Sequence, residues 1–91
     1  MLLGKVIGTV WATRKDEKLE GLKLLVVQHI DLDLSLKKSY AVAADTVGAG
    51  VGEIVMLTTG SSARQSKLTE GKPVDAVVSG IIDKLDVVEK K

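Results

Sequence analysis

Short apolar runs separated by turn-forming residues dominate the pattern of hydrophobic and polar positions along this chain. Runs rich in Val, Ile, Leu and Thr, bounded by Gly, Pro, Asp or Ser, are typical of β-strands. No apolar pattern with the helical period extends over ten residues. The pattern therefore predicts five strands, at residues 2–12, 22–30, 39–44, 54–59 and 74–85.

Glycines inside two of these strands indicate bends in a curved sheet. Gly4 and Gly8 predict a bulge or a tight bend in the first strand, and Gly80 interrupts the last one. Residues 13–21 are polar and charged, which predicts a hairpin-like loop. Residues 31–38 alternate acidic or polar residues with leucine, which fits either a strand edge or a loop with leucine anchors.

Five short strands with glycine bends predict an all-β protein, a small five-stranded OB-like β-barrel. Such a barrel leaves few sheet edges exposed. At most one short helical turn is expected, over residues 61–67, with Ser61 or Ser62 as its N-cap. A chain of 91 residues is too short for two cores, so residues 1–91 are expected to form a single domain.

The hydrophobic content is high for so small a domain. Hydrophobic residues make up 45% of the chain, whereas a domain of this size buries only about 60–65% of the surface of its unfolded chain. Large exposed apolar patches usually mark interfaces. The composition therefore predicts an obligate oligomer.

Composition also limits the kinds of catalytic, metal and cofactor sites that the chain can form. There is no cysteine and only one histidine, so we expect no catalytic triad, no metal site and no cofactor. The acid pairs Asp31 with Asp33 and Asp83 with Asp86 are expected to be surface carboxylates. The apolar runs are too short to span a membrane, and no N-terminal signal is visible, which predicts a cytosolic protein.

Two further side chains have open interpretations. Trp11 is expected to fill the core or an interface rather than to serve as a stacking platform, because no second aromatic residue lies near it. The only histidine, His29, is expected to be structural or exposed, since no catalytic partners are visible.

A glycine-rich loop precedes the fourth predicted strand. Its candidate interface residues are Gly48, Ala49, Gly50, Gly52 and Glu53. A phosphate-binding loop needs Lys-Ser/Thr and a helix after its last glycine, whereas here an acid and a strand follow. Two interpretations remain: an ordinary β-turn, or a close subunit contact or axial rim where only glycine fits. Glu53 either pairs with a basic residue of a neighbour or ends the turn.

A second candidate surface follows the same strand, at Ser61, Ser62 and Arg64. One interpretation is a capped turn with a solvent-facing arginine. The other is an interface, because an arginine fork binds carbonyls or carboxylates of a partner and arginine is enriched at interface hot spots.

Six blocks of the chain carry a family resemblance. They are LGKVIGTVWAT (residues 3–13), GLKLLVV (21–27), DTVGAGVGE (45–53), GSSAR (60–64), PVDA (73–76) and GIID (80–83). In this order and spacing they resemble the pentameric vertex proteins of bacterial microcompartments, the EutN/CcmL family.

The resemblance implies an OB-like barrel that assembles as a cyclic pentamer, although some family members form hexamers in crystals. Such pentamers cap the vertices of a polyhedral shell in the bacterial cytoplasm, whose facets are hexameric shell proteins, and they supply its curvature. It also implies that Ser61, Ser62 and Arg64 belong to a surface that meets neighbouring subunits or hexamers. No enzymatic activity is implied.

Two other classes stay open as alternatives. An OB-fold nucleic-acid-binding module needs a basic groove with aromatic platforms, whereas this chain has a formal charge of +1 and only two aromatic residues. A small enzyme or ligand-binding barrel needs convergent reactive side chains, and none is visible.

Overall fold

The computed structural model describes residues 1–12 and 15–88. Its strands are β1 (Leu2–Thr9), β2 (Leu24–Ile30), β3 (Leu36–Asp45), β4 (Ile54–Thr59) and β5 (Ala76–Ile81). Two short 3₁₀ helices, η1 (Glu17–Leu19) and η2 (Gly60–Arg64), lie between them. The all-β prediction is confirmed, with one more helical turn than the sequence predicted.

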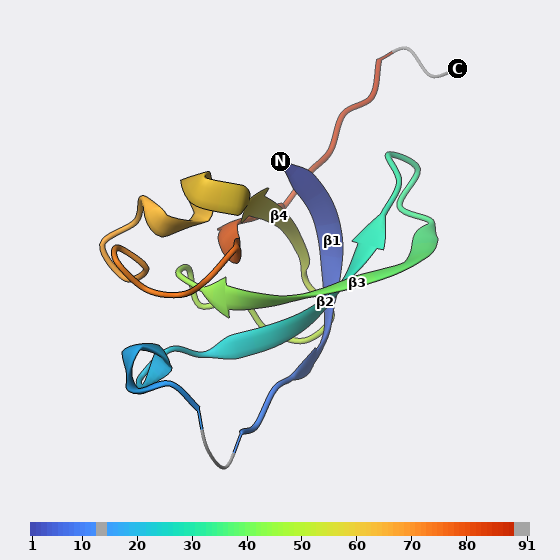
Figure 1. Ribbon diagram of the computed structural model, residues 1–91. Helices are drawn as coiled ribbons and strands as arrows, with labels where there is room; N and C mark the ends of the chain where they lie inside the picture. Colours follow the sequence, from blue (N-terminus) through green and yellow to red (C-terminus); the bar gives the residue numbers. More distant parts are fainter. Residues whose placement is uncertain (13–14, 89–91) are drawn as a thin grey trace.

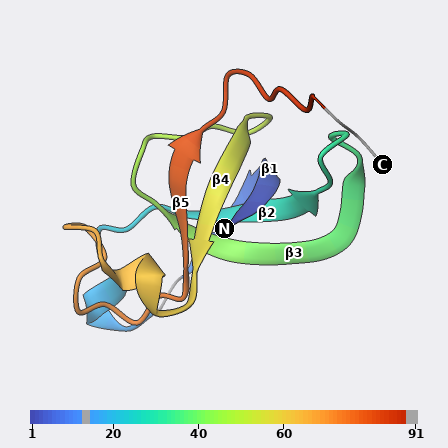
Figure 2. The same cartoon turned by 90° about the horizontal axis from the view of Figure 1, so that it is seen from above.

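The strands close into a barrel in the order β1-β2-β3-β5-β4 (Figures 1 and 2). Neighbouring strands are antiparallel, except that β3 and β5 form a short parallel pair at Ala44–Val77 and Asp45–Val78. The predicted OB-like barrel is therefore confirmed. The rest of β3, residues 36–43, has no pairing with β5.

The predicted bulge in β1 is present. The pairing with β2 shifts register between Val6 and Gly8, which leaves Ile7 as the extra residue. Residues 10–12 are not part of the strand, although Val10 N still donates to Leu24 O at 2.9 Å. The predicted end of this strand was therefore three residues too late.

The second, third and fifth strands also differ from their predicted bounds of 22–30, 39–44 and 74–85. Gly80 does not interrupt β5 but pairs within it, opposite Met56 of β4. Residues 31–38, predicted as either a loop or a strand edge, contain both: a turn comes first and a strand follows. Residues 31–35 form a turn closed by a hydrogen bond from Asp31 N to Ser35 O at 3.0 Å, and β3 begins at Leu36.

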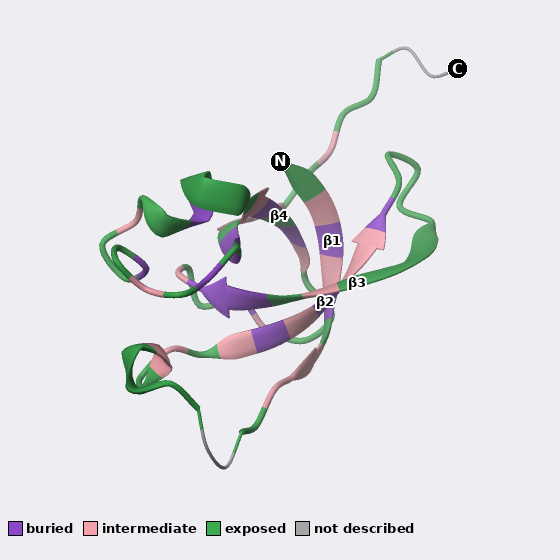
Figure 3. Ribbon diagram, viewed as in Figure 1, coloured by how far each residue is buried: buried purple, intermediate pink, exposed green. Residues whose placement is uncertain are grey.

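The barrel interior holds a core of small aliphatic side chains, and Figure 3 marks the buried residues in purple. Its buried members are Val6, Leu25, Val27, Ala43, Ala49, Val55, Leu57, Ala76 and Val78. With no phenylalanine in the chain, the core is filled by close approach of the strands rather than by large side chains. A buried Leu or Val in such a core contributes about 1.5–3 kcal/mol.

A second cluster lies outside the barrel, under a lobe made of η1, η2 and the loop before β5. It joins Ala44, Ala63, Val74 and Val77 to Leu19, Leu22 and Leu24. Lys72 Nζ also donates to Lys18 O at 3.0 Å and so connects the two halves of the lobe. Within residues 13–21, predicted as a loop, η1 forms because the Asp16 side chain accepts from Lys18 N at 2.8 Å. Residues 13 and 14 lie outside the described part.

The predicted N-cap of the second helical turn is wrong. Its helix η2 begins at Gly60, so Ser61 and Ser62 lie inside it, and the residue before it, Thr59, makes no side-chain cap. Gly60 has a φ of 69°, a left-handed conformation that glycine adopts without strain. This glycine redirects the extended chain into the helix, and its own N–H donates to Asp75 O at 2.8 Å.

Candidate assembly surfaces

The glycine-rich loop connects β3 to β4, and two of its glycines are required by backbone geometry. Gly48 and Gly52 have φ values of 76° and 94°, which other residues adopt only with strain. Glu53 N donates to Gly50 O at 3.1 Å, so residues 50–53 form a β-turn with Gly52 at its third position. The turn interpretation is confirmed for this half of the loop.

Asp45, at the end of β3, holds the first half of the loop from inside. Its Oδ1 accepts from Val47 N at 3.0 Å and Gly48 N at 3.1 Å, and its Oδ2 accepts from Ala49 N at 2.9 Å. Lys23 Nζ lies 3.9 Å from the same carboxylate and donates to Ala49 O at 3.0 Å. The Asp45 carboxylate thus accepts hydrogen bonds from three consecutive backbone N–H groups, which in a strand would be paired with a neighbouring strand.

The second half of the loop is held against β1. Val6 N donates to Glu53 O at 3.0 Å, and Gly52 N donates to Val6 O at 2.8 Å. The exposed Glu53 side chain accepts from Gly50 N at 2.6 Å. Within one subunit Glu53 therefore ends the turn, and its pairing with a neighbour stays a prediction.

The loop presents an apolar outer side. Val51, at the turn, is 67% exposed, and Val47 is also exposed. Gly50 differs from Gly48 and Gly52 because its φ is not positive. A Cβ on Gly50 would meet only Glu53 Oε1, at 3.4 Å. The subunit itself therefore gives little reason for glycine at this position.

The second candidate surface is the exposed side of η2. Ser61 and Ser62 are exposed, while Ala63 is buried in the lobe. Arg64 Nη1 donates to Val74 O at 3.0 Å, so part of its fork is occupied within the chain. Beneath it, the buried hydroxyl of Thr69 donates to Ala63 O at 2.7 Å and holds the helix in place.

The structure does not bring the two candidate surfaces together. The glycine-rich loop precedes β4 and η2 follows it, so they lie at opposite ends of this six-residue strand (Figure 1). At about 3.4 Å per residue the strand separates them by roughly 20 Å. They are two distinct surfaces.

Three residues that support these surfaces were missing from the predicted set: Asp45, Lys23 and Thr69. An aspartate followed by turn-forming residues is a recognisable signal for an Asx-type turn, so Asp45 was open to prediction. Lys23 and Thr69 act through partners 26 and 6 residues away, and no local pattern indicates them.

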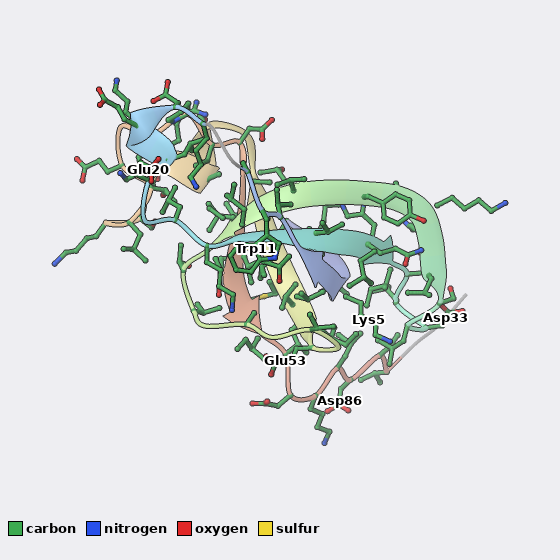
Figure 4. All side chains as sticks on the ribbon, turned by 90° about the horizontal axis from the view of Figure 1, so that it is seen from below. Lys5, Trp11, Glu20, Asp33, Glu53 and Asp86 are labelled. Carbon is green, nitrogen blue, oxygen red and sulfur yellow. The ribbon has the colours of Figure 1, made fainter. Side chains whose placement is uncertain are left out.

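Trp11 is not a core residue. It follows β1 and is 90% exposed (Figure 4), so burial within the subunit is excluded and the interface interpretation stays a prediction. Tyr40 lies on β3 and is also exposed. His29 Nδ1 lies 2.8 Å from Ser39 Oγ, which agrees with a structural histidine.

The described part of the chain shows neither a cluster of metal-ligand side chains nor a membrane-spanning helix. Over residues 1–12 and 15–88, no three His, Cys, Asp or Glu side chains gather as metal ligands. No helix in the same residues has the length and apolar character needed to cross a membrane.

The closed five-stranded barrel, its hydrogen-bonded glycine-rich loop and its exposed apolar side chains are consistent with a protein that assembles with other copies or partners. The family model described as "Ethanolamine utilisation protein EutN/carboxysome" matches residues 1–83. The chain belongs to this family.

Similar proteins extend over nearly the full chain. The bacterial microcompartment shell vertex protein GrpN of Rhodospirillum rubrum is 52% identical over 88 residues, which cover 97% of this chain and 99% of GrpN. The carboxysome shell vertex protein CcmL of Nostoc sp. is 47% identical over 91 residues, covering 99% and 90%.

Solved structures agree with these relatives. The structure of the GrpN pentameric microcompartment shell protein matches with a TM-score of 0.90 at 52% identity, covering 97% of this chain and all of that one. The Nostoc CcmL structure matches with a TM-score of 0.94 at 47% identity, covering 99% and 95%.

Proposed function

We propose that this chain is a structural vertex subunit of a bacterial microcompartment shell, located with the shell in the bacterial cytoplasm. Five copies form a closed ring, which occupies the five-fold vertices of the shell. The observation that carries this proposal is the 52% identity and 0.90 TM-score to a pentameric shell protein over 97% of the chain.

The mechanism of a vertex subunit is geometric rather than catalytic. Six-fold units alone tile a flat sheet, and a closed shell needs five-fold units where the sheet curves. A ring of five is built from head-to-tail contacts, in which two different surfaces of each subunit meet. The hexameric shell proteins are the partners at the outer edge of this ring.

The exposed apolar side chains of the subunit supply the material for these contacts. They include Leu2, Ile7, Trp11, Leu32, Leu34, Leu36, Tyr40, Val42, Val47, Val51, Met56 and Leu68. Burial of apolar area contributes about 25 cal/mol per Å².

The test of this proposal is the mass of the purified native assembly, measured by native mass spectrometry. A mass of five chains of 9.6 kDa supports the vertex role. A stable monomer at micromolar concentration contradicts it, and a six-membered ring contradicts the five-fold mechanism while leaving a ring.

Gly50→Leu is expected to abolish the ring while the subunit stays folded. Because the subunit leaves room for a Cβ at Gly50 and its φ is not positive, a clash there comes from a neighbouring copy. Native mass spectrometry and urea unfolding measure the two effects separately. Gly48→Leu is the control, since its positive φ strains the loop itself and lowers stability. A soluble pentamer of the Gly50→Leu variant would contradict this prediction.

Arg64→Ala is expected to weaken shell closure more than folding. Loss of its hydrogen bond to Val74 O costs about 1 kcal/mol of folding stability, and the rest of the fork is available to a partner. The measurement is the fraction of closed shells on co-expression with hexameric shell proteins, compared with Arg64→Lys, which keeps the charge without the fork. Unchanged incorporation of Arg64→Ala counts against this role.

A further inference from the structure

A groove runs beside the part of β3 that has no pairing with β5. Its larger hollow, of about 470 Å³, is lined by Tyr40 and Val42 of β3 together with Thr59 and Asp75. A smaller hollow, of about 130 Å³, continues it to Val74 in the lobe, and Val42 and Asp75 line both. The two hollows form one groove, which we call the β3 groove.

The wall that β3 gives to this groove is apolar although it faces outward. Side chains alternate between the two faces of a strand, and Ala43 is buried in the core. Tyr40 and Val42 therefore point outward, where they are 58% and 53% exposed. The outward face of an antiparallel sheet is usually polar, and a large exposed apolar surface usually marks an interface. A partner is therefore expected to cover the groove.

The glycine-rich loop contains a narrow projection, the β-turn of residues 50–53, which we call the Val51 turn. Val51 is 67% exposed and lies between two glycines. The positive φ of Gly52 accounts for glycine at that position, whereas the φ of Gly50 is not positive. A Cβ on Gly50 would meet only Glu53 Oε1, at 3.4 Å. Entry of the turn into a groove of limited width explains why Gly50 has no side chain.

The Val51 turn and the β3 groove lie on opposite sides of the closed barrel wall. The turn is hydrogen-bonded to Val6 of β1 and leads into β4. In the order around the barrel, β2 separates β3 from β1, and β5 separates β3 from β4. Figures 2 and 4 show the loop and β3 along opposite edges of the molecule, with Glu53 labelled in Figure 4. The turn therefore does not fill the groove of its own subunit.

We propose that the Val51 turn of one subunit inserts into the β3 groove of the next copy of this chain and so forms the ring contact. This inference rests on the proposed ring and names the surfaces that close it. A head-to-tail ring needs two different surfaces on each subunit. A projection and a hollow on opposite sides of one barrel provide such a pair, with the Val51 side chain packed against Val42 and Tyr40.

The charges around the two surfaces are complementary. The turn carries the exposed Glu53, and Lys5 lies beside it on β1, paired with Ile54 of β4. The groove has the exposed Asp75 in its wall, and exposed Lys38 lies two residues before Tyr40 on β3. Each surface thus has one acid and one base, so Glu53 meets Lys38 and Lys5 meets Asp75. Such exposed pairs add little energy, but they favour this orientation over others.

Engineered cysteines test this contact directly, because the chain contains no cysteine of its own. The variant carries Val51→Cys together with Val42→Cys, both at exposed positions. A disulfide forms only where the two Cα atoms lie within about 7 Å. Because a head-to-tail contact joins each subunit to the next, oxidation is expected to yield a ladder from dimer to full ring on a denaturing gel.

The matched control for the disulfide is Val51→Cys with Lys84→Cys. Lys84 is exposed and lies beside Ile54 at the start of β4, on the same side of the barrel as the Val51 turn. In the proposed ring these two positions of neighbouring copies do not meet. The control is therefore expected to stay monomeric on the gel.

Val42→Arg provides a second measurement, by native mass spectrometry on dilution. An arginine head group loses hydration when an apolar contact covers it, so the rings are expected to dissociate at about tenfold higher protein concentration or more. Leu68→Arg is the control, because Leu68 is similarly exposed (51% against 53% for Val42) and lines neither hollow. Urea unfolding of both variants checks that the subunits stay folded.

The outcomes separate this contact from the ring itself. Rings of the cysteine variant that give no ladder, or equal ladders from the control pair, overturn the docking of the Val51 turn and leave the vertex role in place. Equal dissociation of the Val42→Arg and Leu68→Arg rings has the same meaning. Absence of any ring in the unaltered protein overturns both proposals.

Discussion

Asp45→Ala is expected to destabilise the subunit by about 3 kcal/mol, a large part of the 5–15 kcal/mol typical of a small domain. The change removes the acceptor of three consecutive amides, those of Val47, Gly48 and Ala49. Ala49 is fully buried in the core, so water does not replace the lost partner there. The loop that carries the first candidate surface loses its shape together with this stability.

The measurement is urea unfolding at one fixed protein concentration, because assembly adds to apparent stability by mass action. Glu53→Ala is the matched control, since it removes one hydrogen bond, to Gly50 N, at an exposed position of the same loop. Its effect is expected to stay below about 1 kcal/mol. Equal losses for the two variants contradict the role assigned to Asp45.

Gly4→Ala is expected to cost about 2–3 kcal/mol of unfolding free energy, through overpacking of the barrel interior. A Cβ on Gly4 would overlap Val27 Cγ1 and lie 3.1 Å from the backbone oxygen of Gln28. Since Val27 is fully buried, neither neighbour has space into which to move. The absence of a side chain at Gly4 is what lets β1 approach β2.

Gly80→Ala is the matched control, in a second strand of the same barrel. Its Cβ would lie 2.6 Å from Met56 Cε, the flexible end of a side chain that is partly exposed. A shift of that methyl group relieves the contact, so we expect a change within about 0.5 kcal/mol. Thermal unfolding of both variants measures the difference.

A second substitution tests the steric cause at Gly4. Val27→Ala removes the overlapping methyl group, so Gly4→Ala is expected to cost less in that background than in the unaltered chain, a non-additivity of at least 1 kcal/mol. Strictly additive effects would assign the cost of Gly4→Ala to another cause.

The local pattern predicted the strands well where both ends carry turn residues. The fourth strand was predicted at residues 54–59 and β4 has these bounds, because glycines flank it on each side. The first strand was predicted too long, because Val10 and Trp11 continue its apolar run after pairing with β2 has ended. The pattern of apolar and polar residues along one strand does not show where its pairing with the neighbouring strand ends.

The glycine-rich loop and η2 were predicted from the sequence as interface surfaces. In the subunit, Ser61 and Ser62 are exposed. Which glycine serves the fold was not visible, since Gly48, Gly50 and Gly52 look alike in the sequence and only two have a positive φ. Their use as subunit contacts stays a prediction.

The sequence by itself determined the all-β class, the number of strands and the family. The first two depend on apolar runs bounded by turn-forming residues, and the family depends on motifs at fixed spacing. Only the tertiary structure decided which residues face one another across the barrel. Closure places Asp45 beneath the glycine-rich loop and Gly4 against Val27. These relations depend on strand register and barrel closure, which pair residues far apart in the chain and leave no local pattern in the sequence.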